Sequence, residues 1–178
     1  LTLEATGDIH LSPGIKIKSE GLTPPSSRTF KGNLVIKSTN GGLSGGLAAG
    51  SVNGGIAVSN LIVDQGGDST FAGSIEVFDD DDSQIGDYGE AIVFEKLGEG
   101  ALTLTNANNS FHKQAWSSAF SPSPNFDSFL QLTDGVLVLG QAGALGDSED
   151  VIVFNGGTLR YTSASATDDI SGRMALGI

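Results

Sequence analysis

The side chains best suited to bind a metal ion are carboxylates in the loop FDDDDSQIGDYGE, residues 78–90. They are Asp79, Asp80, Asp81, Asp82, Asp87 and Glu90. Carboxylate oxygens suit Ca²⁺, but an EF-hand aligned on Gly86 places Ser83 and Ile85 at ligand positions and Ile92 where its bidentate Glu belongs. The Gly-rich stretch 41–55 also lacks the periodic Asp of calcium-binding nonapeptide repeats. We therefore expect a solvated turn between strands, with calcium binding at Asp79–Asp82 as the alternative.

Catalytic residues are not apparent. A polysaccharide lyase or hydrolase would need paired carboxylates, or Ca²⁺ with a basic residue. The arginines are Arg28, Arg160 and Arg173. Asp168 and Asp169 are adjacent, so in a strand they would face opposite sides. His10 and His112 lack the spacing of a Ser-His-Asp triad or a metal site, and we expect both on the surface. The expectation is no enzyme, no cofactor and no metal site, with a carbohydrate-active enzyme as the least favoured alternative.

Aromatic residues are concentrated in HKQAWSSAFSPSPNFDSF, residues 112–129, which contains Trp116, Phe120, Phe126 and Phe129. Exposed aromatic side chains anchor sugars and protein partners. The segment could therefore bind a surface glycan or protein. The interpretation we favour is that it folds back and buries its aromatic side chains against the flank of the fold.

Composition limits the partners. The 178 residues include 21 acidic and 9 basic side chains, a net charge of −12, which disfavours nucleic acid. No apolar run is long enough to insert into a membrane. There is no Cys, so disulfides and thiolate metal sites are impossible. The chain begins at Leu1 and ends in GRMALGI, which looks like the start of another strand, so we expect a segment of a longer protein.

Short strands of period two, separated by Gly, Asp and Asn turns, dominate the chain, and helix periodicity is nearly absent. The expected strands are residues 1–5, 9–11, 15–18, 33–38, 56–64, 70–78, 91–97, 101–105, 129–133, 136–140, 151–155 and 158–162. Two architectures fit such strands: an antiparallel sandwich or barrel, and a parallel solenoid.

Internal repetition favours the solenoid. Residues 98–111, 133–147 and 154–162 share a Gly-containing turn followed by an apolar strand, and 30–38 and 52–60 are looser copies. Gly and Asn would supply corners with positive φ. A common period of roughly 20–25 residues per rung would give about seven to nine rungs. The strand residues below are expected to alternate between inside and outside, the inward ones forming apolar ladders. They are Leu102, Leu104, Leu137, Leu139, Leu159 and Tyr161.

Three phrases in order, KLGEGALTLTNANNSF, LQLTDGVLVLGQAGALGD and VIVFNGGTLRYTSASATDDISGRMALG, resemble the autotransporter-associated β-strand repeat, or passenger-associated transport repeat. STFAGSI, residues 69–75, resembles its usual lead-in, and the likeness covers residues 69–178. The matching positions are Lys96, Gly98, Gly100, Leu102, Thr103, Leu104, Asn109, Gly135, Leu137, Ala144, Leu145, Gly146, Asn155, Gly156, Gly157, Thr158 and Leu159. The chain departs from the family at 112–129, a loop insertion in place of a short Tyr-Thr-Gly-Gly-Thr link. Residues 1–68 are only generically similar to secreted β-helix chains.

The resemblance implies an all-β, right-handed parallel β-helix over residues 1–178, located outside the cell or on a bacterial surface. It implies a stalk, passenger or fibre segment that aids export, display or self-assembly and has no catalytic role. Its partners would be neighbouring rungs of the same chain or further copies stacked end to end. The alternative is an adhesin that binds through residues 112–129.

Overall fold

The structure, a computed structural model, describes residues 1–18, 33–46, 54–58, 60–77, 91–111, 128–146 and 151–176. Within these ranges the chain is all-β, as predicted: it has no α-helix and only two 3₁₀ turns, η1 (Ser163–Ser165) and η2 (Ser171–Arg173). No helical segment in them is long and apolar enough to span a membrane. The strands are β1 (Thr2–Ala5), β2 (Ile9–Leu11), β3 (Lys16–Lys18), β4 (Asn33–Ser38), β5 (Leu43–Gly45), β6 (Gly55–Val58), β7 (Asn60–Gln65), β8 (Ser69–Phe71), β9 (Ser74–Val77), β10 (Ala91–Leu97), β11 (Ala101–Leu104), β12 (Ser128–Leu132), β13 (Val136–Leu139), β14 (Val151–Phe154), β15 (Thr158–Tyr161) and β16 (Met174–Leu176).

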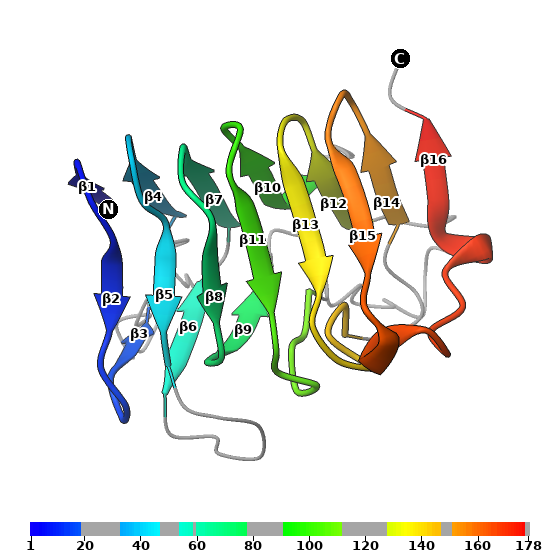
Figure 1. The fold of residues 1–178 in the computed structure, drawn as a ribbon, viewed down its shortest axis with the longest axis horizontal. Helices are drawn as coiled ribbons and strands as arrows, with labels where there is room; N and C mark the ends of the chain where they lie inside the picture. The colour runs from blue at the N-terminus through cyan, green and yellow to red at the C-terminus, as the bar shows by residue number, and fades with distance from the viewer. Residues whose placement is uncertain are drawn as a thin grey trace, which may run out of the picture.

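These strands form three sheets, in which every pairing is parallel (Figure 1). Sheet A has the order β1-β4-β7-β10-β12-β14-β16, sheet B β2-β5-β8-β11-β13-β15, and sheet C β3-β6-β9. Up to β9 the chain passes through sheets A, B and C in turn; from β10 on, the described strands alternate between sheets A and B. Each pass returns the chain to sheet A one position further along. We call one such pass a rung. Because no antiparallel pair occurs among the described strands, the antiparallel sandwich or barrel does not fit.

The rungs differ in length. One register position of sheet A is occupied by Leu34, Leu61, Phe94, Leu130, Ile152 and Met174. Successive members are 27, 33, 36, 22 and 22 residues apart. The predicted period of 20–25 is therefore right only for the last two intervals. It is wrong for the others because long segments, including 78–90 and 112–127, lie between the strands. The seven strands of sheet A agree with the lower end of the predicted rung count.

The predicted ladders are present, with one correction. Leu102 pairs with Leu137, and Leu137 with Leu159; Leu104 pairs with Leu139, and Leu139 with Tyr161. All six residues thus share two register positions of sheet B and do not alternate between its faces. The four on β11 and β13 are buried, whereas on the edge strand β15 Leu159 is partly buried and Tyr161 is exposed. Burial of these columns supplies the apolar stabilisation that one isolated rung lacks.

Two predicted strands prove to be two strands each. Residues 56–64 contain parts of β6 and β7, and 70–78 contain most of β8 and all of β9, each pair divided between different sheets. Strand β5 escaped prediction because glycines surround it, while β16 confirms the strand expected at the end. The insertion predicted at 112–129 is two residues too long, because Ser128 already begins β12.

The three close copies of the repeated phrase do stack on one another, as β11, β13 and β15 of sheet B. The looser copies, 30–38 and 52–60, are not equivalent to them, because their strands belong to sheets A and C. Glycines with positive φ do occur at corners: Gly98 has φ +73° and Gly135 φ +63°. A Cβ at Gly135 would also lie 2.2 Å from the carbonyl oxygen of Gly98, so glycine is required there.

Candidate functional site: polar residues that bridge the rungs

Gln65, at the end of β7, is fully buried and joins three rungs. Its Oε1 accepts from the backbone N–H of Leu43 on the preceding rung at 3.3 Å. Its Nε2 donates to the carbonyl oxygen of Ala101 on the next rung and to that of Gly67 on its own, both at 3.0 Å. Parallel pairing stops at this corner, so backbone groups there need other partners. An amide carries both a donor and an acceptor and satisfies groups on either side.

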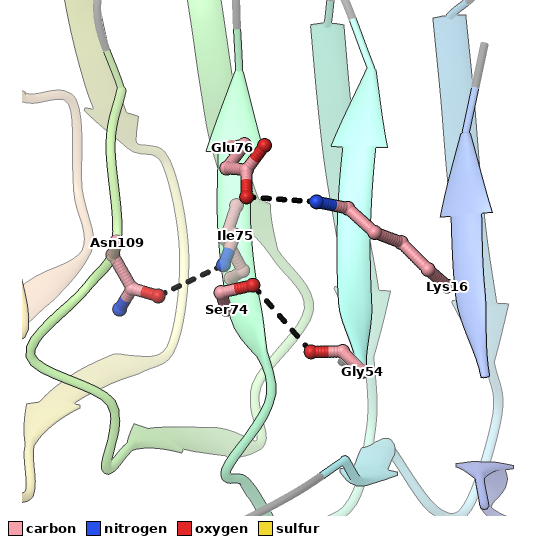
Figure 2. A network of polar contacts seen from close by, with 6 residues as sticks. All are labelled: Lys16, Gly54, Ser74, Ile75, Glu76 and Asn109. Carbon is pink, nitrogen blue, oxygen red and sulfur yellow. Dashed lines mark hydrogen bonds and ion pairs between the residues drawn. The ribbon is translucent and has the colours of Figure 1, made fainter. Parts of the chain in front are cut away.

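Asn109 performs the same task at another corner. Its Oδ1 accepts from the N–H of Ile75 on the preceding rung at 2.9 Å (Figure 2). Its Nδ2 donates to the carbonyl oxygen of Ala144 on the following rung at 2.8 Å. The neighbouring Asn106 donates to the carbonyl oxygen of Ala72 at 2.9 Å. The Asn-rich turn therefore holds successive rungs together, a structural task for residues that the sequence marked only as a turn.

Lys96 is the most unusual buried residue. It occupies an inward column of sheet A between Val63 and Leu132, with no exposed surface. Its Nζ donates to the carbonyl oxygens of Leu97 and Gly98, the latter at 2.8 Å. Burial lowers the Lys96 pKa from 10.5 to about 8, although the carboxylates of Asp134, Asp64 and Asp68 act in the opposite direction. The Lys96 ammonium therefore donates hydrogen bonds to the turn that follows β10, although burying its charge is unfavourable.

On sheet C an ion pair crosses a whole strand. Lys16 Nζ on β3 lies 2.8 Å from Glu76 Oε1 on β9, and β6 runs between them (Figure 2). The crossing is possible because β6 presents Gly55 opposite Lys16 and Ala57 opposite Glu76. Both charged side chains keep part of their surface exposed, so the pair contributes roughly 1 kcal/mol or less.

Of the histidines and arginines singled out in the sequence, His10 and Arg160 lie in the described ranges at opposite ends of sheet B. His10 on β2 is exposed, as expected, and Arg160 on β15 is also exposed. Arg173 is instead buried and donates to the carbonyl oxygen of Leu145 at 3.3 Å. Arg28 and His112 lie outside the described residues, as do the acidic loop 78–90 and residues 112–127 with Trp116, Phe120 and Phe126.

Asp168 and Asp169 are not in a strand, so the prediction of opposite strand faces does not apply. They lie between η1 and η2 and bind different backbone groups. Asp168 accepts from the N–H of Gly143 at 3.0 Å, and Asp169 accepts from the N–H of Ser171 at 2.9 Å. The second contact lowers the pKa of the Asp169 carboxyl. Each aspartate thus caps a turn.

One contact was not anticipated. His10 Nδ1 lies 3.2 Å from Ser44 Oγ, at the centre of the sequence Gly-Leu-Ser-Gly-Gly. The imidazole covers Gly45, where an added Cβ would be 2.7 Å from its Cε1 atom. A serine activated as a nucleophile by a histidine needs that histidine to be oriented by a third group, usually a carboxylate. Within the described ranges no carboxylate contacts His10, and no cluster of three metal-ligating side chains occurs. The contact is a cross-strand pair on the surface of sheet B.

No known family model, curated protein or solved structure matches this chain significantly. The likeness to the autotransporter-associated repeat therefore rests on the sequence phrases themselves.

Proposed function

We propose that residues 1–178 form a right-handed parallel β-helix that serves as a stalk or passenger segment of a large bacterial protein, secreted or displayed at the cell surface. The observation that carries this proposal is the cyclic path of the chain, which returns to parallel sheet A one strand further along on each pass. The phrases resembling the autotransporter-associated repeat support the same reading, because their strands β11, β13 and β15 stack in register.

The proposed mechanism is mechanical. Each rung buries its apolar column on the next, and Gln65 and Asn109 fasten neighbouring rungs at the corners. In such a solenoid, stability comes from interfaces between neighbours, so folding propagates from a formed end. Folding outside the cell would then oppose backsliding of the chain during export.

Further rungs are the proposed partners of the two ends, supplied by the same protein or by another copy. Four large apolar side chains of the described residues are well exposed: Leu1, Ile15, Tyr161 and Met174. Leu1 and Ile15 adjoin the first strands, β1 and β3; Tyr161 and Met174 lie in the last, β15 and β16. Edge strands carry unpaired backbone groups that invite another parallel strand.

Deleting one rung tests this function. Removing residues 130–151 joins Phe129 to Ile152, which takes the register position of Leu130. A stalk should keep its fold, export and display, with a length shorter by about 4.8 Å. The matched control removes residues 130–140, half a rung, and should abolish folding because the strands change sheets. Loss of display in a well-folded full-rung deletion would contradict the stalk.

An adhesin is the second candidate. It is favoured by the positions of the residues that flank the insertion: Phe111 before it and Leu130 after it are both fully buried. A loop held at both ends by a rigid scaffold is a common place for binding residues. The double substitution Trp116→Ala with Phe120→Ala should abolish cell or glycan binding while circular dichroism and thermal unfolding stay unchanged. Binding that survives in this variant would eliminate the adhesin reading.

A further inference from the structure

Two Asn-Gly dipeptides lie wholly within the described residues. Asn40-Gly41 joins β4 to β5, and Asn155-Gly156 joins β14 to β15. Both therefore occupy the corner at which the chain passes from sheet A to sheet B. Asparagine before glycine is chemically labile, because no Cβ shields the glycine nitrogen from the asparagine side chain. Attack requires that this nitrogen be accessible and not already engaged as a hydrogen-bond donor.

The corner at Asn155 meets both conditions. Asn155 and Gly156 are exposed, and Gly156 has φ +116°. The N–H groups on either side of Gly156 are engaged: those of Asn155 and Gly157 both donate to the carbonyl oxygen of Leu132, at 2.9 and 3.0 Å. In the described part of the chain neither the N–H of Gly156 nor the side-chain amide of Asn155 has a hydrogen-bond partner.

The corner at Asn40 has the same dipeptide, but its glycine nitrogen is buried and hydrogen-bonded. Asn40 is exposed, yet Gly41 is buried and its N–H donates to Ser38 Oγ at 3.0 Å. Ser38 is itself fixed by donating to the carbonyl oxygen of Gly7 at 2.7 Å. A Cβ at Gly41 would lie only 2.4 Å from Asp8 Oδ1, which shows how tightly this turn is enclosed. Its nitrogen is therefore both engaged and covered.

We propose that Asn155 is a site of spontaneous deamidation and isoaspartate formation, and that Asn40 is protected. The Gly156 nitrogen gives its proton to a solvent base and bonds to Cγ of Asn155. The side-chain nitrogen takes up a proton and leaves as ammonia. Water then opens the resulting five-membered imide at one of its two carbonyls, giving either aspartate or isoaspartate. No reagent other than water is consumed.

The modification alters the corner in two ways. It adds a negative charge to a chain that already carries −12. The isoaspartyl product also inserts an extra backbone carbon at residue 155, three residues before β15 begins at Thr158. Among the described strands, β15 is at the edge of sheet B and pairs with β13 alone, starting from the contact of the Thr158 N–H with the Gly135 carbonyl oxygen at 2.9 Å. The added carbon is expected to loosen this strand and leave β11 and β13 paired.

Peptide mapping by mass spectrometry, after ageing the folded chain at mildly alkaline pH, tests the proposal. Asn155 should convert severalfold faster than Asn40. In the urea-unfolded chain the two dipeptides should convert at similar rates, because the difference arises from the fold. Equal rates in the folded chain, faster conversion of Asn40, or an unconverted Asn155 would each overturn the proposal.

Two variants sharpen this test. Asn155→Gln should abolish the conversion at that corner and leave unfolding by urea unchanged. Ser38→Ala frees the N–H of Gly41, so Asn40 should then convert faster than in the parent chain. Circular dichroism checks that Ser38→Ala folds. If it does not, the conversion rates of Asn40 and Asn155 in the folded parent chain are the test of the proposal.

Discussion

Replacing Lys96 by methionine should remove a rise in stability that the parent chain shows between about pH 8 and pH 10.5. Lys96 has a pKa of about 8 when folded, against 10.5 for a free lysine. Between these values the unfolded chain holds the proton and the folded chain does not. The free energy of unfolding therefore rises with pH across this window. Methionine is similar in length and has nothing to titrate.

The size of the effect follows from the shift. Each pKa unit corresponds to about 1.4 kcal/mol, so the rise attributable to Lys96 is at most about 3.5 kcal/mol. At pH 7 the substitution has two opposing consequences. It removes a buried charge, but it leaves the carbonyl oxygens of Leu97 and Gly98 without their donor, at roughly 1–3 kcal/mol each. The dependence on pH is therefore more diagnostic than stability at one pH.

Urea unfolding of both chains over this pH range measures the effect, and the quantity to follow is the difference between their unfolding free energies. Burial raises the pKa of Tyr161, so its contribution to the free energy of unfolding falls as pH rises above 10. This fall is the same in both chains and cancels in the difference. Lys37→Met, at an exposed position of β4, is the matched control and should keep the rise. Parallel curves for the parent chain and Lys96→Met would refute the assignment of a buried, easily deprotonated lysine.

Other substitutions compare how much residues of the core, the corners and the surface contribute to the free energy of unfolding. Gln65→Leu should cost about 2–4 kcal/mol in urea unfolding, since it leaves buried backbone groups of two neighbouring rungs unpaired; a loss below 1 kcal/mol would contradict the bridging role. Leu102→Ala should cost about 2–5 kcal/mol, whereas Thr103→Ala, on the opposite face of β11, should change stability by less than about 0.5 kcal/mol. Equal losses would mean that the faces are wrongly assigned. Glu76→Gln should cost no more than about 1 kcal/mol, and high salt should erase the difference from the parent chain.

The sequence predicted most strands because alternation with period two is a local property. It could not assign them to sheets, because a run such as residues 70–78 contains a corner at Gly73 that leaves the alternation of residue types almost intact. Strand β5 escaped notice because glycine disfavours strands. Gly45 is nevertheless needed there, since a Cβ would lie 2.2 Å from the carbonyl oxygen of Leu11.

The polar residues of the corners were harder to foresee. Gln65 and Lys96 look like exposed residues in the sequence, and only the stacking of neighbouring rungs buries them. The resemblance marked the positions of Lys96 and Asn109 but not their partners, which lie more than 30 residues away for Asn109. The sequence Gly-Leu-Ser-Gly-Gly around Ser44 has the Gly-x-Ser-x-Gly spacing found around some nucleophilic serines. Its contact with His10 could not be predicted, because it depends on β2 and β5 becoming neighbours.

The stacking of rungs is tested most directly by distances between spin labels, which are easily attached because the chain has no cysteine of its own. Labels on Cys introduced at Arg160 and, in turn, at Thr70, Ser44 and His10 would lie on one register row of sheet B, separated by three, four and five strand spacings. At about 4.8 Å per spacing, the distances should grow in equal steps to about 24 Å. Distances that do not increase in this order would contradict parallel stacking and, with it, the proposed stalk.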